Sequence, residues 1–182
     1  MKKKIFIGIG IFTFLLIVGF LYLNYRNRSL SPPGVAKYEQ NNLSMEISYS
    51  RPSVKGRQIF GTKEEGALLP YGVYWRLGAN EATEITISRD VLFNGNELDA
   101  GTYKMYAVPG PETFEISLNS ELGNWGYSEP DYDKDILKTT VPVETGASPV
   151  EQFTIRFEES GPKVLVVCEW SDVKVKIPVD VR

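Results

Sequence analysis

The stretch TEITISRDVLFNGNELDAGTYKMYAVPG, residues 83–110, decides the fold class of this chain. Its first part, TEITIS at 83–88, places isoleucine at alternate positions between polar residues, and this period of two is typical of a strand with one face in water. Asn-Gly at 94–95, between Val91-Leu92-Phe93 and Glu97-Leu98, is a strong signal for a β-hairpin. Pro-Gly at 109–110 forces a turn after a further alternating segment. The stretch therefore predicts short strands joined by tight turns.

The same alternation recurs on both sides of this stretch. LSMEISYS at 43–50 alternates strictly, and the pattern returns at 137–143, 153–157 and 173–179. VLVVC at 164–168 is apolar throughout, which indicates a central strand covered on both faces. Outside the N-terminal segment, no stretch keeps helical spacing over about ten residues. With about nine or ten short strands, the sequence predicts an all-β fold, a two-sheet antiparallel β-sandwich.

The N-terminal segment has a different composition. Residues 5–23 are apolar apart from one threonine and three glycines, and they follow three lysines at 2–4. As a helix these residues span roughly 28 Å, close to the thickness of a hydrocarbon core. The segment ends without the small residues of a signal-peptide cleavage site. We therefore expect a transmembrane anchor at 1–25, a linker at 26–34 and one β-sandwich domain at 35–182.

Positive charges at the two ends of the anchor predict its orientation. Three lysines precede the apolar segment, whereas Arg26 and Arg28 follow it. The more positive end favours the cytoplasm, so we expect the N terminus inside the cell and the domain outside. In a bacterium with an outer membrane, this predicts a single-pass protein of the inner (cytoplasmic) membrane whose domain faces the periplasm.

The net charge of the chain after residue 26 limits the classes of molecule that it can bind. Four of the 20 Lys and Arg lie in residues 1–26, which hold none of the 23 Asp and Glu, so the remainder carries a net charge of −7. Nucleic-acid-binding domains are usually basic, and only basic surfaces gain from contact with anionic lipid. We therefore expect no nucleic-acid partner.

The missing histidine excludes several chemistries. With no His in the chain, Ser-His-Asp and Cys-His nucleophile systems and histidine-ligated zinc are ruled out. The single cysteine, Cys168, excludes an intrachain disulfide and lies in the apolar run VLVVCEW, which favours a buried structural residue over a reactive thiol. Any catalysis would use carboxylates, Lys, Tyr or a metal held by oxygen. The composition disfavours an enzymatic function, and we expect no cofactor.

Four motifs occur in a fixed order: RPSVKGRQIFG at 51–61, PYGVYWRLGANEAT at 70–83, AGTY at 100–103 and WG at 125–126. In these motifs the chain resembles the bacterial domain of unknown function 2911 family. The resemblance covers roughly residues 43–180 and implies a small domain that is mostly secreted or located in the cell envelope. It implies no established activity. The chain departs from the family at Phe114, where members often carry Trp, and between 127 and 135.

Basic residues in these motifs suggest an anion site. The set is Arg51, Lys55, Arg57 and Arg76. Arginine presents a planar fork of donors that fits carboxylate, sulfate or phosphate, so several on one loop system would bind an anion or an acidic sugar. Alternatively, these residues pair with Glu64, Glu81 or Glu84 and brace an irregular segment. Trp75, beside Arg76, would allow cation-π stacking.

The tract GANEAT at 78–83 supplies further candidates. Asn80 and Glu81 offer a donor-acceptor pair, and in an enzyme Glu81 would be the proton-transfer group. Alternatively, Asn80 adopts a turn conformation and Glu81 binds an arginine. The catalytic residues are left unassigned. The predicted ligand-binding residues are Arg51, Lys55, Arg57, Trp75, Arg76, Asn80 and Glu81.

Three acids at alternate positions, Asp131, Asp133 and Asp135, resemble the start of a calcium loop. An EF-hand is ruled out because Ile136 and Pro142 stand where glycine and glutamate are required. A solvated acidic loop is favoured over a looser calcium site, and we expect no metal. Trp125, just before this loop, either caps the core or lines a pocket.

The leading hypothesis is a membrane-tethered binding or interaction domain that takes a small anionic, peptide or glycan ligand on the 51–83 surface. One alternative is a carboxylate-dependent hydrolase acting on envelope glycans, which needs two acids roughly 5–10 Å apart. Another alternative is a purely structural envelope component. In that case the basic residues would all be paired within the protein.

Overall fold

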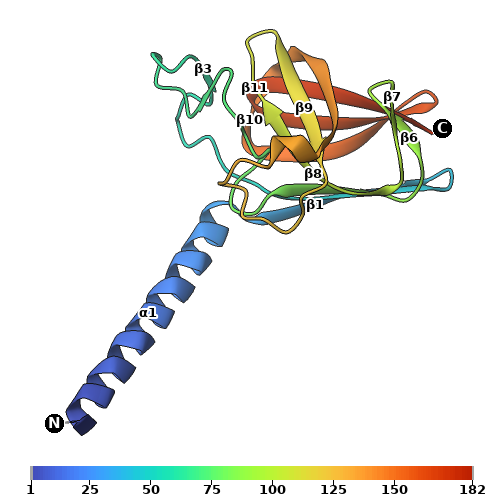
Figure 1. The fold of residues 1–182 in the computed structure, drawn as a ribbon. Helices are drawn as coiled ribbons and strands as arrows, with labels where there is room; N and C mark the ends of the chain where they lie inside the picture. Colours follow the sequence, from blue (N-terminus) through green and yellow to red (C-terminus); the bar gives the residue numbers. More distant parts are fainter. Residues whose placement is uncertain (1, 182) are drawn as a thin grey trace.

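The computed structural model describes residues 2–181, which form one long helix followed by a β-sheet body (Figure 1). The helix, α1, spans Lys2–Leu30 and projects from one end of the body. Residues 1 and 182, the outer ends of the predicted segments, lie outside the described residues. The strands are β1 Pro33–Gln40, β2 Leu43–Ser50, β3 Phe60–Gly61, β4 Leu69–Pro70, β5 Thr83–Ile87, β6 Val91–Phe93, β7 Asn96–Leu98, β8 Gly101–Val108, β9 Thr113–Asn119, β10 Asp135–Ser160 and β11 Lys163–Val181, with a short 3-10 helix, η1, at Tyr132–Lys134.

The junction between α1 and the body differs from the expected linker at 26–34. The helix continues to Leu30, and β1 begins at Pro33, so that residues 31–32 alone separate the two elements. The helix ends here because Pro32 disfavours helical geometry at Ser31, and proline has no N–H to donate. The body therefore follows the helix without a spacer.

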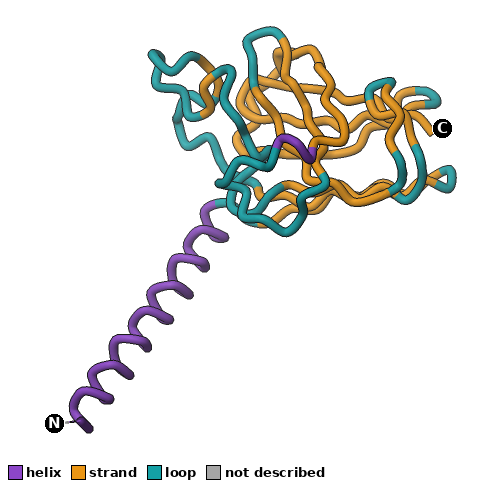
Figure 2. The backbone as a smooth tube through the Cα atoms, viewed as in Figure 1, coloured by secondary structure: helices purple, strands orange, loops and turns teal. Residues whose placement is uncertain are grey.

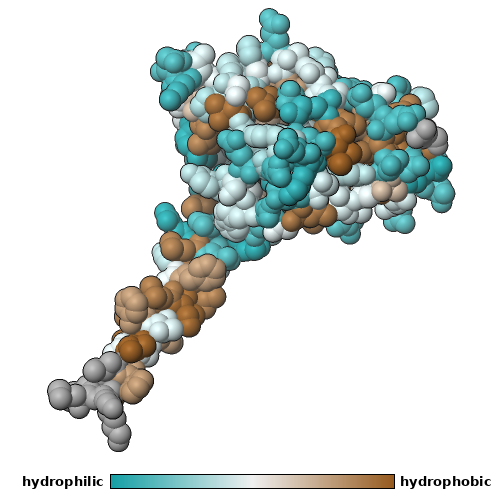
Figure 3. All heavy atoms as spheres, in the orientation of Figure 1, coloured by the Kyte–Doolittle hydropathy of each residue, from teal (hydrophilic) through white to brown (hydrophobic). Residues whose placement is uncertain are grey.

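Helix α1 has the properties of a membrane span. Phe6–Leu30 is long and apolar enough to cross a membrane, and the apolar window within it is not buried by the rest of the protein. Apolar residues predominate along the middle of α1, whereas hydrophilic residues cover much of the same face of the body (Figure 3). An apolar surface of this kind is stable in lipid and costly in water.

The body is a two-layer antiparallel sandwich, as the alternation predicts. Nine strands follow one hydrogen-bonded order, β1-β2-β5-β8-β9-β10-β11-β6-β7. Strand β10 joins the layers, because its residues 135–142 pair with β9 and its residues 143–160 pair with β11. Figure 2 shows the strands folded over one another in this way. The small parallel pair of β3 and β4 stands apart from this sheet and was not predicted.

Turn chemistry and core packing agree with the sequence patterns. Asn94 and Gly95 join β6 to β7 with φ angles of 47° and 78°, the positive pair that a tight hairpin turn requires. Apolar side chains of the two layers fill the space between them. Tyr49 closes the layers at one side, since its hydroxyl oxygen accepts from the Ile155 N–H at 3.0 Å. Its ring also meets Phe153 edge-on at 5.7 Å.

Candidate functional site

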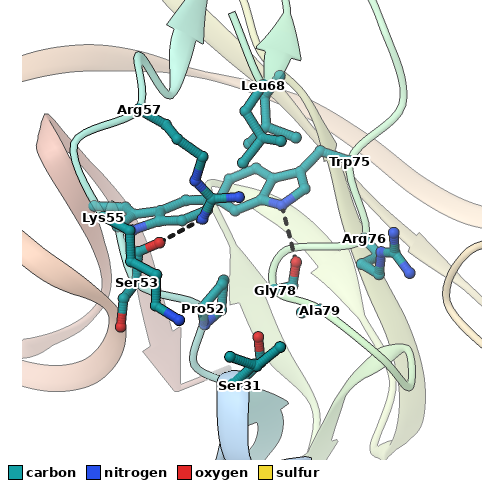
Figure 4. A pocket seen from close by; sticks show the side chains of 13 residues that line it. Ser31, Pro52, Ser53, Lys55, Arg57, Leu68, Trp75, Arg76, Gly78 and Ala79 are labelled. Carbon is teal, nitrogen blue, oxygen red and sulfur yellow. Dashed lines mark hydrogen bonds between the residues drawn. The ribbon is translucent and has the colours of Figure 1, made fainter. Parts of the chain in front are cut away.

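A cavity of about 480 Å³ lies where α1 meets the body (Figure 4). Leu30 and Ser31, at the end of the helix, form one side of it. The loop that follows β2 and the loop between β4 and β5 form the other sides. These two loops carry the RPSVKGRQIFG and PYGVYWRLGANEAT motifs, so the candidate site is built from the most distinctive part of the sequence.

Two tryptophans form the apolar floor of the cavity. Trp75 and Trp170 are stacked with ring centroids 5.9 Å apart and are only 4% and 2% exposed. The indole N–H of Trp75 donates to the Gly78 carbonyl at 3.3 Å, and its backbone exchanges two 2.8 Å hydrogen bonds with Ala107 of β8. The floor is therefore fixed by both packing and hydrogen bonding. Leu68 and Leu69 extend this apolar surface.

The loop after β2 brings two cations to the cavity, Lys55 and Arg57. The Arg57 guanidinium donates to the carbonyls of Ser53 and Val54 at 2.5 and 3.0 Å, which fixes its side chain. The loop itself is tied to β10, because the Lys55 N–H donates to the Glu151 carboxylate at 3.0 Å. Two of the five guanidinium donors of Arg57 are thus used, and three are left for a ligand.

Arg76 supplies a third cation from the loop before β5. Its guanidinium donates to the Asn80 carbonyl at 3.5 Å and lies 5.7 Å from the ring centroid of Tyr127. Partial burial lowers the pKa of Arg76 from its usual value. The group still carries its charge at neutral pH, because the pKa of arginine is so high.

The cationic groups are not neutralised by nearby acids. Among the side chains that the structure describes, no ion pair joins Lys55, Arg57 or Arg76 to a carboxylate. Two of the three glutamates considered as braces have other partners: Glu81 pairs with Arg28, and Glu84 accepts from the Gly123 N–H at 2.9 Å. Glu64 forms no ion pair with these cations among the described side chains. The guanidinium groups of Arg57 and Arg76 are held instead by hydrogen bonds to backbone carbonyls.

Three of the predicted ligand-binding residues lie outside the cavity lining. Arg51 directly follows β2, and its side chain donates to the Thr154 hydroxyl within β10 at 3.3 Å. Asn80 has a φ of 57°, the turn conformation proposed for it, and its amide donates to the Ser31 carbonyl at 3.3 Å. Glu81 binds Arg28 of α1. Asn80 and Glu81 thus attach the body to the helix, while Lys55, Arg57, Trp75 and Arg76 line the cavity.

Close backbone approach explains one glycine in this region. Gly78 has a φ of 150°, and a Cβ added there would lie 2.7 Å from the Ser50 carbonyl oxygen. The loop before β5 therefore lies directly against the end of β2, which holds Trp75 over the core.

Sequence reasoning missed three contributors to the cavity: Leu30, Ser31 and Trp170. The first two were placed in a linker. Trp170 continues the alternation of β11 onto the inner face, so its burial could have been inferred, but its meeting with Trp75 depends on the tertiary fold.

Asp131 and Asp135, two of the three acids considered for a calcium loop, have structural partners. Asp131 caps η1 by accepting from the Asp133 N–H at 3.2 Å. Asp135 accepts from the Tyr106 hydroxyl at 2.7 Å and from the Asn119 amide at 2.8 Å. Within the described residues, no group of three or more His, Cys, Asp or Glu side chains is arranged to hold a metal ion.

A buried lysine beneath this loop was also missed. Lys104 lies on the outward face of β8, is only 1% exposed, and its ammonium group has no hydrogen-bond partner within the described residues. Burial lowers its pKa, while the charges of Glu121, Glu84 and Asp135 act in the opposite direction. No local pattern predicts this burial, because an alternating lysine on a strand normally faces water.

Comparison with known proteins assigns the body of the chain to a protein family. The family model described as "Protein of unknown function (DUF2911)" matches residues 31–179. A search of curated proteins and a search of solved structures each found no match. The matched region begins where α1 ends and covers every strand of the body up to the last residues of β11. The chain therefore belongs to the DUF2911 family.

Proposed function

We propose that this protein is a membrane-anchored binding module whose β-sandwich takes a small anionic ligand in the cavity beside α1. The observation that carries the proposal is that Lys55, Arg57 and Arg76 all line one cavity without a carboxylate partner among the described side chains, although the Arg76 guanidinium points away from the other two (Figure 4). Cations grouped in this way repel one another, and an anion would relieve that repulsion.

The cavity suits an organic anion. Its volume of about 480 Å³ lies within the usual range for small-molecule sites. Leu30 and Leu68, each 43% exposed, offer an apolar surface for the body of the ligand beside the buried rings of Trp75 and Trp170. The cations of the lining offer donors for a carboxylate, sulfate or phosphate group. An acidic sugar or an acidic peptide end fits this description.

The membrane placement belongs to the same proposal. Helix α1 is apolar enough to cross a membrane, and the three lysines at 2–4 favour the cytoplasm for its N-terminal end. The binding domain then faces outward, into the periplasm of a bacterium with two membranes. There it would meet envelope or imported ligands.

A binding role is better supported than hydrolysis of glycans. None of the residues that line the cavity is Asp or Glu, whereas glycoside hydrolysis needs two carboxyl groups. Glu81, the residue chosen for proton transfer, is engaged by Arg28 instead. A purely structural role predicts internally paired cations, and Lys55 in particular has no side-chain partner among the described residues.

Ligand binding is tested with the full chain in detergent micelles. Phosphate, sulfate, a uronic acid and an acidic peptide are titrated by calorimetry and thermal shift, alongside the neutral parent sugar. We expect at least one anion to raise the melting temperature, and we expect Lys55→Gln and Arg76→Gln to weaken its binding at least tenfold, since charged hydrogen bonds contribute about 1.5–3 kcal/mol each.

Lys63→Gln is the matched control, because Lys63 lies exposed in the same region but does not line the cavity. Equal affinity in the wild type, Lys55→Gln and Arg76→Gln would show that any bound anion lies elsewhere. A chain that binds none of the anions would refute the proposal.

A further inference from the structure

The loop between β9 and η1, residues 120–131, exposes large side chains. Trp125 is 46% exposed and Tyr127 is 77% exposed, and Leu122 is exposed beside them. The other two tryptophans, Trp75 and Trp170, are buried in the core. Trp125 does not line the cavity beside α1, and about half of its surface is exposed.

This 120–131 loop lies against the segment that holds α1. Trp125 forms an isolated β-bridge with Glu81, and the Gly126 N–H donates to the Asn80 carbonyl at 3.1 Å. Glu81 in turn binds Arg28 in the last turn of the helix. In Figure 1 the orange loop before the β10 strand passes beside the end of α1. The exposed rings are thus fixed close to the helix.

The depth of the loop in a membrane follows from the helix. The apolar segment ends at Leu23, and Arg28 is five residues further on, about 8 Å along the axis at 1.5 Å per residue. Each headgroup layer outside the hydrocarbon core is about 5–8 Å thick. Arg28 therefore lies at the outer boundary of the headgroup layer when α1 spans the membrane. Glu81 holds the loop near this boundary, because it binds Arg28 and bridges to Trp125.

Helix α1 already carries aromatic residues just below this level, at the edge of the apolar segment. Tyr22 and Tyr25 are exposed where the apolar segment ends. Trp and Tyr favour this region because one side of the ring is apolar and the other carries a polar group. Trp125 and Tyr127 would extend the same aromatic belt sideways from the helix onto the body.

We propose that the 120–131 loop rests in the headgroup layer of the membrane that α1 crosses, with Trp125 and Tyr127 seated at the interface. The inference rests on the membrane anchoring in the proposed function, but not on its ligand. The lipid surface would be mainly zwitterionic, because Glu121 and Glu129 in the loop disfavour anionic lipid. This second attachment would fix the tilt of the body and the height of its cavity above the bilayer.

Tryptophan fluorescence tests the contact directly. The full chain is reconstituted in phosphatidylcholine vesicles, with and without lipids that carry a quenching spin label on the headgroup. We expect part of the emission to be quenched by the labelled lipid, and we expect this quenching to be lost in Trp125→Phe. Trp170→Phe is the matched control and should retain it, because Trp170 is buried in the body.

Vesicle flotation after an alkaline wash separates this inference from the proposed anchoring. A chain that stays with the vesicles but shows no lipid quenching, with Trp125 quenched by aqueous iodide instead, overturns the loop contact and leaves the anchor intact. A chain that washes off the vesicles overturns both. Trp125→Phe should keep the wild-type melting temperature, since the ring is half exposed, so a loss of quenching reports contact rather than unfolding.

Discussion

Arg28 in the last turn of α1 forms an ion pair with Glu81, which lies 53 residues later in the loop before β5. This contact joins the helix to the body at the point where the cavity opens, since Leu30 and Ser31 line the cavity just beyond Arg28. The hydrogen bond from the Asn80 amide to the Ser31 carbonyl adds a second link. The orientation of the helix and the shape of the cavity are therefore linked through a few exposed polar contacts.

Replacing Glu81 by glutamine should loosen this junction with little loss of stability. Both partners of the pair are about half exposed, and such pairs contribute roughly 0–1 kcal/mol. We expect trypsin to cleave after Arg28 faster in the variant, as measured by mass spectrometry of the full chain in micelles. Glu46→Gln is the control, because it breaks the exposed pair with Lys37 between β1 and β2. Equal cleavage rates in the two variants would contradict the structural role of the pair.

Replacing each tryptophan by alanine should distinguish the buried rings from the exposed ring by the loss of stability. Trp75→Ala and Trp170→Ala each remove a fully buried indole, and we expect each to lower the free energy of unfolding by about 3–5 kcal/mol in urea titrations. Trp125→Ala removes an exposed ring in detergent solution and should cost less than about 0.5 kcal/mol. A large loss in Trp125→Ala would mean that this ring is packed within the body.

Lys104 should destabilise the folded state at neutral pH. Its ammonium group is buried without a hydrogen-bond partner in the described residues, and leaving such a group unpaired costs about 1–3 kcal/mol. Lys104→Met keeps the shape of the side chain without the charge. We expect the variant to be more stable than the wild type by a similar amount in urea unfolding at pH 7.

The pH dependence has a definite sign. Burial lowers the pKa of Lys104 in the folded state below its ordinary value of 10.5, so the unfolded chain binds more protons between the two pKa values. The wild type should therefore gain stability relative to Lys104→Met as the pH rises towards 10.5, and the advantage of the variant should shrink. Comparison of the two proteins cancels the titration of the tyrosines. A constant difference across this range would show that Lys104 has a normal pKa.

Cys168 should be inert in the native protein. The side chain is buried in β11, and burial raises the pKa of its thiol to about 12. Because the thiolate is the reactive form, we expect iodoacetamide to label Cys168 at neutral pH only after unfolding, as followed by mass spectrometry. Rapid labelling of the folded chain would indicate an exposed, reactive site.

Local patterns were sufficient to predict most of the body. Alternation in 43–50 and 83–88 corresponds to β2 and β5, and the Asn94-Gly95 dipeptide forms the expected turn between β6 and β7. These features depend on residues close in sequence, for which side-chain period and turn conformation are decisive. The two-layer arrangement followed from the number of such segments.

The candidate site was predictable in part, because its geometry depends on contacts between distant segments. The motif residues Lys55, Arg57, Trp75 and Arg76 do meet in one cavity. Trp170 also lines the cavity, although it lies 95 residues after Trp75 in the sequence. Leu30 lines it from 25 residues before Lys55. Neither residue carries a local sequence signal of this role. Glu81 and Asn80 contact the end of the helix because α1 continues past residue 25, where the anchor was expected to end, and stops at Leu30 before Ser31-Pro32.

The contribution of Leu30 and Ser31 to the cavity has a consequence for any released form of this protein. Proteolytic shedding within α1 would free a soluble fragment with an intact β-sandwich, but one wall of its binding pocket would be missing or unsupported. Under the proposed function, such a fragment would bind an anion more weakly than the full chain. The membrane helix would then contribute to the shape of the cavity as well as to anchoring.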